Sequence, residues 1–161
     1  MPDPVLIGSP VVRIDVVIRI GDHLLAATDD PLFLGLRGPT GREFRLLMAH
    51  GKSLRRKSED RFLLGPAGSG DTNVANPELN DPTRPALTAA SIESVYLRKG
   101  VDPIPNVRAV GELDDRLELV RAEVVVHAED GAHRRFVREG PLWLGLNAGM
   151  SIELARLDED R

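Results

Sequence analysis

Residues 13–20 have the sequence RIDVVIRI, in which the apolar residues Ile14, Val16, Ile18 and Ile20 occupy every second position. Successive side chains of a β-strand point to opposite faces, so this alternation places the four apolar side chains together. Charged residues predominate at the positions between them. The stretch therefore predicts a strand that buries one face and exposes the other.

Seven more runs are rich in the apolar, β-branched and aromatic residues that favour strands. They are Leu32–Leu36, Glu43–Met48, Arg61–Leu64, Ile92–Arg98, Leu117–His127, Arg134–Arg138 and Ile152–Leu154. Turn residues separate several of these runs, at Gly38–Gly41, Glu129–Gly131 and Gly140–Pro141. The Glu129–Gly131 segment predicts an antiparallel hairpin with positive φ at Gly131. Eight short strands punctuated in this way predict an all-β sandwich or barrel.

The composition excludes several classes of protein. The chain has 161 residues, which is enough for one domain with a sizeable core. A formal net charge of -4 disfavours nucleic acid as a partner, and the absence of cysteine excludes disulfides and thiolate chemistry. No apolar run approaches the roughly 18 residues of a membrane span, and the N-terminus lacks signal-peptide features. We therefore expect a cytoplasmic protein, either unattached or peripheral to a membrane.

The sequence predicts a single domain over residues 13–155, between an N-terminal extension at 1–12 and a charged tail at 156–161. Within it, residues 65–91 are rich in Pro, Gly, Asn, Asp, Thr and Ala and predict one long irregular loop. We interpret this loop as a surface excursion packed on one edge of the sandwich; a functional lid or partner-binding loop is the alternative. The expected core comprises Phe33, Phe62, Val95, Leu97, Val124, Val126, Phe136 and Trp143.

No motif in the sequence predicts catalysis. The histidines, His23, His50, His127 and His133, lack the spacing that places two zinc ligands on one face. No serine has the Gly-x-Ser-x-Gly context of a nucleophile elbow. Adjacent acidic residues, such as those at 114–115, would point to opposite faces of a strand. We expect no catalytic site in this chain.

Acidic and threonine side chains are frequent in the expected connections between strands. They are Asp22, Thr28, Asp29, Asp30, Asp102, Asp114 and Asp115. Calcium takes about six to eight oxygen ligands, which converging loops can supply. For any single aspartate, however, a solvated turn residue is the better interpretation. The residues alone leave both alternatives open.

Several motifs occur in a particular order along residues 13–154. They are Ile20–Asp22, Ala27–Asp30, Leu32–Arg37, Leu54, Ser58–Phe62, Ile92–Lys99, Leu117–Val126, Phe136 and Leu142–Leu144. This order resembles that of a PLAT (lipoxygenase-homology) domain. Thr28–Asp30, Leu32–Phe33 and Tyr96–Lys99 are similar to the C-terminal membrane-binding domain of bacterial phospholipase alpha-toxins.

The resemblance implies an eight-stranded antiparallel β-sandwich of two sheets, PLAT/C2-like, and this agrees with the strand count. It also implies a non-catalytic role, in which loops at one end recruit a catalytic partner to a membrane, to lipid or to another protein.

A calcium site is implied as well. In it Thr28 would offer its backbone carbonyl, and Asp29 and Asp115 would offer carboxylates, with Asp22 beside them.

Two departures from the family pattern weaken this calcium site. Ala27 stands where the family has glycine, and Ser53 stands where an acidic residue is expected. Lys52 adds a positive charge beside Ser53. Because calcium affinity follows the number of charged ligands, these changes lower the expected affinity.

Membrane docking needs apolar loop tips and attraction to anionic headgroups. Leu24 and Leu25 provide one candidate apolar tip, and Ile104 between two prolines provides another.

The strongest basic cluster comprises Lys52, Arg55, Arg56 and Lys57 and could meet lipid phosphates. Such clusters also protect edge strands from pairing with other chains, and this is the interpretation that we favour.

Two functions follow from the sequence. The first is a lipid- or membrane-docking module assisted by calcium, which predicts that Leu24, Leu25 and Asp29 lie together at one exposed end. The second is a calcium-free protein–protein interaction sandwich that serves as a scaffold or as the partner of a separate enzyme. It predicts that Asp29 and Asp115 lie apart or cap turns.

Overall fold

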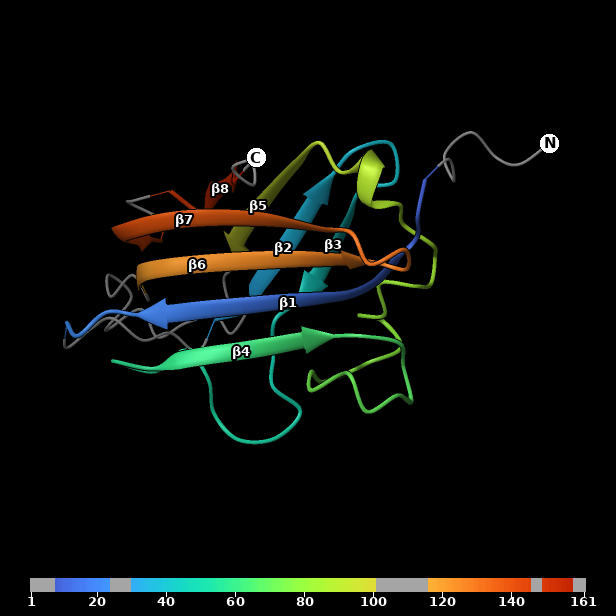
Figure 1. Ribbon diagram of the computed structural model, residues 1–161. Helices are drawn as coiled ribbons and strands as arrows, with labels where there is room; N and C mark the ends of the chain where they lie inside the picture. The colour runs from blue at the N-terminus through green and yellow to red at the C-terminus, as the bar shows by residue number, and fades with distance from the viewer. Residues whose placement is uncertain (1–7, 24–29, 101–115, 146–148, 158–161) are drawn as a thin grey trace.

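The computed structural model describes residues 8–23, 30–100, 116–145 and 149–157, and it contains eight β-strands (Figure 1). The strands are β1 (Val11–Ile20), β2 (Leu32–Arg37), β3 (Arg42–Arg45), β4 (Glu59–Leu64), β5 (Ser94–Lys99), β6 (Leu117–Ala128), β7 (His133–Leu144) and β8 (Ser151–Leu157). A 3-10 turn, η2 (Ala89–Ser91), precedes β5. The all-β class and the eight antiparallel strands are confirmed, and no helix in the described ranges is long and apolar enough to cross a membrane.

The strands form one hydrogen-bonded series, in the order β3-β2-β5-β8-β7-β6-β1-β4. The expected division into two separate sheets is therefore not what the pairing shows. The reason lies in β8, whose first half, from Ser151, pairs with β5 and whose last residues, to Leu157, pair with β7. One strand thus carries the hydrogen bonding from one half of the fold to the other.

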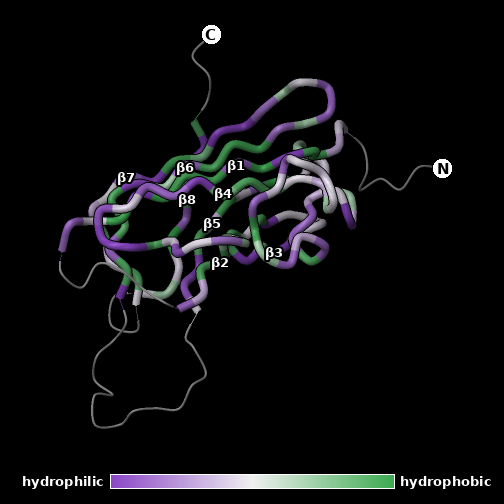
Figure 2. Tube along the Cα trace, turned by 90° about the horizontal axis from the view of Figure 1, so that it is seen from below, coloured by the Kyte–Doolittle hydropathy of each residue, from purple (hydrophilic) through white to green (hydrophobic). Residues whose placement is uncertain are grey.

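The series folds over so that its two halves face each other. In Figure 1, β7, β6, β1 and β4 lie in front, and β5, β2 and β3 cross behind them at a steep angle. Figure 2, turned by 90°, shows the two groups as opposed layers with hydrophobic segments along β1 and β6. The core lies between them and is built on the alternation seen in the sequence, since Ile14, Val16 and Ile18 are all 0% exposed.

Six of the eight expected core residues are buried, namely Phe62, Val95, Leu97, Val124, Val126 and Phe136. Phe33 and Trp143 are not; both are only partly buried. Phe33 alternates with Leu32 and Leu34, which face the core, so it lies on the outer face under the guanidinium of Arg98. Phe44 is a fully buried aromatic residue that the expected core omitted.

The hairpin expected at Glu129–Gly131 is confirmed, and Gly131 has a φ of 87°. The turn expected at Gly140–Pro141 is wrong, because β7 continues through it to Leu144. The pairing of β6 with β7 shifts register between Leu119 and Arg121, opposite this point, as in a β-bulge. A Cβ at position 140 would lie 2.2 Å from the carbonyl oxygen of Leu119, so only glycine fits.

The long loop was expected on one edge, but it contacts both edge strands of the series. On the β4 side, the Leu63 N–H donates to Asn73 Oδ1 (2.7 Å), and the Asn73 N–H donates to the Leu63 carbonyl (3.1 Å). On the β3 side, the Arg45 N–H donates to Asn80 Oδ1 (2.8 Å). We call residues 65–91 the clasp, since they join the two ends of the sheet.

Strand direction divides the connections between the two ends of the molecule. Every neighbouring pair is antiparallel, so β1, β3, β5 and β7 all finish where β2, β4, β6 and β8 begin. We call this the loop end; it faces left and downward in Figure 1. The clasp and the hairpins that follow β2 and β6 belong to the opposite end.

Candidate functional site

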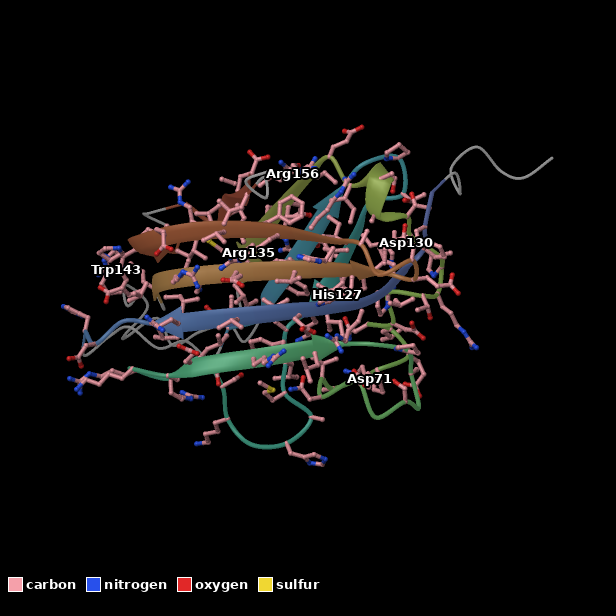
Figure 3. All side chains as sticks on the ribbon, in the orientation of Figure 1. Asp71, His127, Asp130, Arg135, Trp143 and Arg156 are labelled. Atoms are coloured by element: carbon pink, nitrogen blue, oxygen red, sulfur yellow. The ribbon has the colours of Figure 1, made fainter. Side chains whose placement is uncertain are left out.

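Trp143 lies at the loop end, as Figure 3 shows, opposite the end that carries Asp130. It is the penultimate residue of β7 and points to the outer face because its neighbour Leu144 is buried. The guanidinium of Arg116 lies 5.1 Å from the indole centroid, and His23 packs edge-on against the ring with centroids 5.3 Å apart. The indole is therefore partly exposed and held between two nitrogen-bearing side chains.

Asp22, an expected metal ligand, lies next to this cluster. Its side chain is 62% exposed, and its Oδ1 lies 2.7 Å from Arg56 Nη2 and 3.4 Å from Lys57 Nζ. Arg56 Nε also donates to the Asp22 carbonyl (2.7 Å). The carboxylate is thus engaged by two cations.

The other expected calcium ligands, Thr28, Asp29 and Asp115, lie outside the described residues. The expected apolar tips Leu24, Leu25 and Ile104 lie outside them as well. Within the described part of the chain, no group of three or more His, Cys, Asp or Glu side chains could hold a metal ion. Asp22 is therefore the one expected ligand that the structure describes, and the calcium site stays a prediction.

The basic cluster divides into two groups. Arg56 and Lys57 contact Asp22, while Lys52 and Arg55 line a pocket whose wall includes neither Arg56 nor Lys57. None of these residues belongs to a strand, so the arrangement differs from that of charges placed along an exposed edge.

The pocket has a volume of about 180 Å³ and opens beside the end of β3. Arg45, Lys52 and Arg55 supply its cations, and Leu46, Leu47 and Leu54 supply apolar surface. All of them come from the end of β3 or from the connection that follows it, so the pocket belongs to the loop end.

A buried ion pair borders the pocket. Lys99 is only 2% exposed, and its Nζ lies 2.5 Å from Oδ2 of Asp30, a residue of the pocket wall. Burying a charge is costly unless a partner of opposite charge compensates it, and each member here compensates the other. The pair therefore neutralises the acidic side chain of the wall.

The outer face of the front layer is a different kind of charged surface. Glu123 contacts both Arg121 (2.9 Å) and Arg135 (2.8 Å), and the hydrogen bond from Arg135 is the largest influence that lowers the pKa of Glu123. Asp15 contacts Arg13 (3.0 Å) and Arg61 (3.1 Å) in the same way. Because these charges compensate one another within the face, we place the candidate site at the loop end instead.

The sequence held signals for some of the residues that its interpretation missed. Leu142 and Leu144 flank Trp143, so strict alternation would have placed the indole outside. Likewise Val95, Leu97 and Lys99 share one face of a strand, which would have placed Lys99 inside. Local sequence does not predict that Arg45 and residues 51–55 line one pocket, because this depends on how the chain folds back after β3.

No family model and no curated protein matches this chain. Solved structures with a similar fold include the alpha-toxin of Clostridium perfringens from avian strain SWCP, with 13% identity and a TM-score of 0.58 over 95% of this chain and 34% of the toxin. The alpha-toxin of Clostridium absonum matches with 15% identity and a TM-score of 0.57, over 94% of this chain and 33% of the toxin. A lipoxygenase, Delta413-417:GS LOX, matches with 13% identity and a TM-score of 0.55, over 91% of this chain and 17% of the enzyme.

The chain spans about a third of each toxin and about a sixth of the lipoxygenase. At these identities the likeness concerns the fold, and the part of the toxins and of the lipoxygenase that it covers is their PLAT/C2-like domain. The chain therefore has a PLAT-like fold, as its sequence resemblance implied.

Proposed function

We propose that this chain is a non-catalytic lipid- or membrane-docking module, and that the loop end is the surface that meets the membrane. Trp143 carries the proposal, because it is a partly exposed indole at that end with Arg116 stacked against it. Tryptophan is enriched at membrane–water interfaces, where its ring is apolar and its N–H remains hydrated. The PLAT-like fold supports the same role.

Cations near Trp143 support an electrostatic contribution. Arg56 and Lys57 contact Asp22, and the next residue, His23, contacts the indole. Each Lys or Arg close to an anionic membrane contributes roughly 1 kcal/mol, and this contribution falls as salt is added. We therefore propose that the indole and these cations act together.

Calcium enters the proposal as a second, separable contribution. To use the Asp22 carboxylate, calcium would have to displace Arg56 and Lys57 from it. The sequence of residues 101–115 contains four acidic residues, Asp102, Glu112, Asp114 and Asp115, and one arginine. The net negative charge of this segment would repel anionic lipid unless a bound cation neutralised it. Docking is therefore to be measured with and without calcium.

The alternative, a calcium-free protein-interaction sandwich, has less support. It would use the long loop for its partner, but that loop is bonded to both edge strands. Leu79, which is 74% exposed, is the one large hydrophobic residue of the clasp that remains available at its surface. A single exposed leucine is ordinary for a soluble protein and identifies no partner.

The test uses Trp143 as its own reporter, since the chain has one tryptophan. Vesicles of phosphatidylcholine with phosphatidylserine are added to the protein in calcium and in EDTA, and fluorescence emission and co-sedimentation are measured. We expect a shift of the emission to shorter wavelength together with co-sedimentation. The double variant Arg56→Gln/Lys57→Gln should bind more weakly, by about 2 kcal/mol or less at low salt.

The matched control is Arg84→Gln/Arg138→Gln, which removes the same charge from exposed positions away from the loop end. This control should bind as the wild type does. If emission and sedimentation stay unchanged in both calcium and EDTA, the docking proposal is wrong and the protein-interaction alternative replaces it.

A further inference from the structure

The pocket beside β3 has the size of a site for a small polar group. Its volume of about 180 Å³ is several times the roughly 30 Å³ that one water molecule occupies in the liquid. It is smaller than the roughly 300–1,000 Å³ typical of pockets for drug-sized ligands. A compact group with a few heavy atoms would fill it.

The charges around the pocket favour an anion. Arg45, Lys52 and Arg55 line it, and Asp30 is the one acidic side chain among the described residues of its wall. Lys99 compensates the charge of Asp30, since its Nζ lies 2.5 Å from Asp30 Oδ2. Among the described residues neither Arg45 nor Lys52 has an ion-pair partner. The wall therefore carries an excess of positive charge that an anion can neutralise.

The segment that presents Lys52 and Arg55 is held in place before any ligand arrives. Oδ2 of Asp60 accepts the Leu54 N–H (2.8 Å) and the Ser58 hydroxyl (2.7 Å). The Ser58 hydroxyl in turn accepts the Arg55 N–H (3.0 Å). Leu54 has a φ of 58°, a left-handed conformation that costs energy in a residue with a side chain. Such a fixed backbone lowers the entropy lost when a ligand binds.

The residue types narrow the class of anion. Arginine presents paired N–H donors that match phosphate oxygens, and lysine adds a mobile point charge. Leu47 is 38% exposed at the same pocket, and it provides apolar surface for whatever carries the phosphate. We propose that this pocket binds a phosphate monoester group. Its source is either a lipid headgroup, in which case the inference rests on the docking function proposed above, or a soluble phosphate ester, in which case it does not.

The first experiment measures the shared chemistry without any membrane. Inorganic phosphate and glycerol 3-phosphate are titrated calorimetrically into the full chain, with sulfate at equal ionic strength as a comparison. We expect saturable binding of the phosphates that is weakened about tenfold or more in Arg45→Gln/Lys52→Gln, since each lost cation removes a charge-assisted hydrogen bond. Arg138→Gln, at an exposed position on β7, is the control and should bind as the wild type does.

The second experiment separates the two sources. Vesicles containing phosphatidic acid are compared with vesicles in which phosphatidylserine supplies the same total charge. Stronger binding to phosphatidic acid that is lost in Arg45→Gln/Lys52→Gln supports the pocket with a lipid headgroup as ligand. Phosphate binding without this preference supports the pocket with a soluble ester as ligand.

Two results would overturn the inference. One is the absence of saturable phosphate binding, and the other is an equal loss in Arg138→Gln and in the pocket variant. Vesicle docking that still depends on Trp143 and Arg56 would then leave the proposed function standing without the pocket. Circular dichroism of each variant checks that it is folded, as expected for substitutions at exposed positions.

Discussion

Trp143 shows how the position of one residue changes its role. Because the indole lies on the outer face, truncation should cost little stability: we expect Trp143→Ala to lower the free energy of unfolding by about 1–2 kcal/mol. Phe136→Ala, in the core at 2% exposure, should cost about 3–5 kcal/mol. Urea unfolding followed by circular dichroism measures both, and equal losses would show that Trp143 belongs to the core.

Alternation predicts the buried face of β1, and it also decides which side chains of β2, β5 and β7 face inward. The expected core includes Phe33 and Trp143, whereas their strand neighbours Leu32 and Leu144 occupy the inner face. Lys99 is the opposite case, since its strand position is inward although its charge favours water. In all three the strand period outweighs the average preference of the residue type.

Lys99 and Asp30 should depend on each other for stability. Replacing one partner of a buried ion pair removes the opposite charge that compensates the other, so Lys99→Met should lower the free energy of unfolding by about 3–5 kcal/mol. The double variant Lys99→Met/Asp30→Asn removes both charges and should cost less than the single variant. The single variant Asp30→Asn completes the cycle. If the double variant loses as much unfolding free energy as the two single variants together, the two charges are not coupled.

At the scale of elements, the clasp is organised by Asp81, which is 2% exposed. Its carboxylate accepts the Ala67 N–H (3.0 Å), the Thr83 N–H (2.8 Å) and the Thr83 hydroxyl (2.5 Å). Burial by itself raises the pKa of Asp81, but the hydrogen bonds from Thr83 and Ala67 together hold that pKa below its ordinary value. The charged form is thus the one that the folded clasp requires.

This pKa predicts the direction of a pH effect. A carboxyl group with a lower pKa in the folded state than in the unfolded state contributes stability above the unfolded value, about pH 4, and loses it as pH falls toward the folded value. We expect urea unfolding to show stability falling below about pH 4 in the wild type and falling less steeply in Asp81→Asn. Asp71→Asn, at an exposed position in the clasp, is the control for the same chemical substitution. Identical slopes in all three proteins would exclude Asp81 as a contributor.

The elements that sequence reasoning misjudged depend on contacts between distant residues. Gly140–Pro141 has the composition of a turn, but the Leu119 carbonyl packs against Gly140, and β7 passes through a bulge instead of ending. Asn80 caps the N–H of Arg45, 35 residues earlier in the chain. The local composition of residues 65–91 favours a loop, but it contains no information about which edges of the sheet that loop contacts.

At the scale of the whole molecule, the alternating strand directions collect the candidate residues at one end. Asp22, Arg45, Arg56, Arg116 and Trp143 come from four different parts of the chain, and each lies within a few residues of a strand terminus at the loop end. The sequence could predict such convergence through the antiparallel arrangement that its turns indicated. It could not predict that Arg56 would contact Asp22 while Lys52 would face a pocket.

The clasp contacts both edge strands of the molecule, and a sheet with two unpaired edges can pair with other chains. Asn73 covers the Leu63 N–H of β4 and Asn80 covers the Arg45 N–H of β3. We expect Asn73→Ala/Asn80→Ala to lose about 2–4 kcal/mol of stability and to associate as its concentration rises. Urea unfolding and sedimentation velocity measure the two effects, with Glu78→Ala, at an exposed position of the clasp, as the control. A double variant that loses stability but stays monomeric would show that the asparagines hold the clasp without shielding the edges.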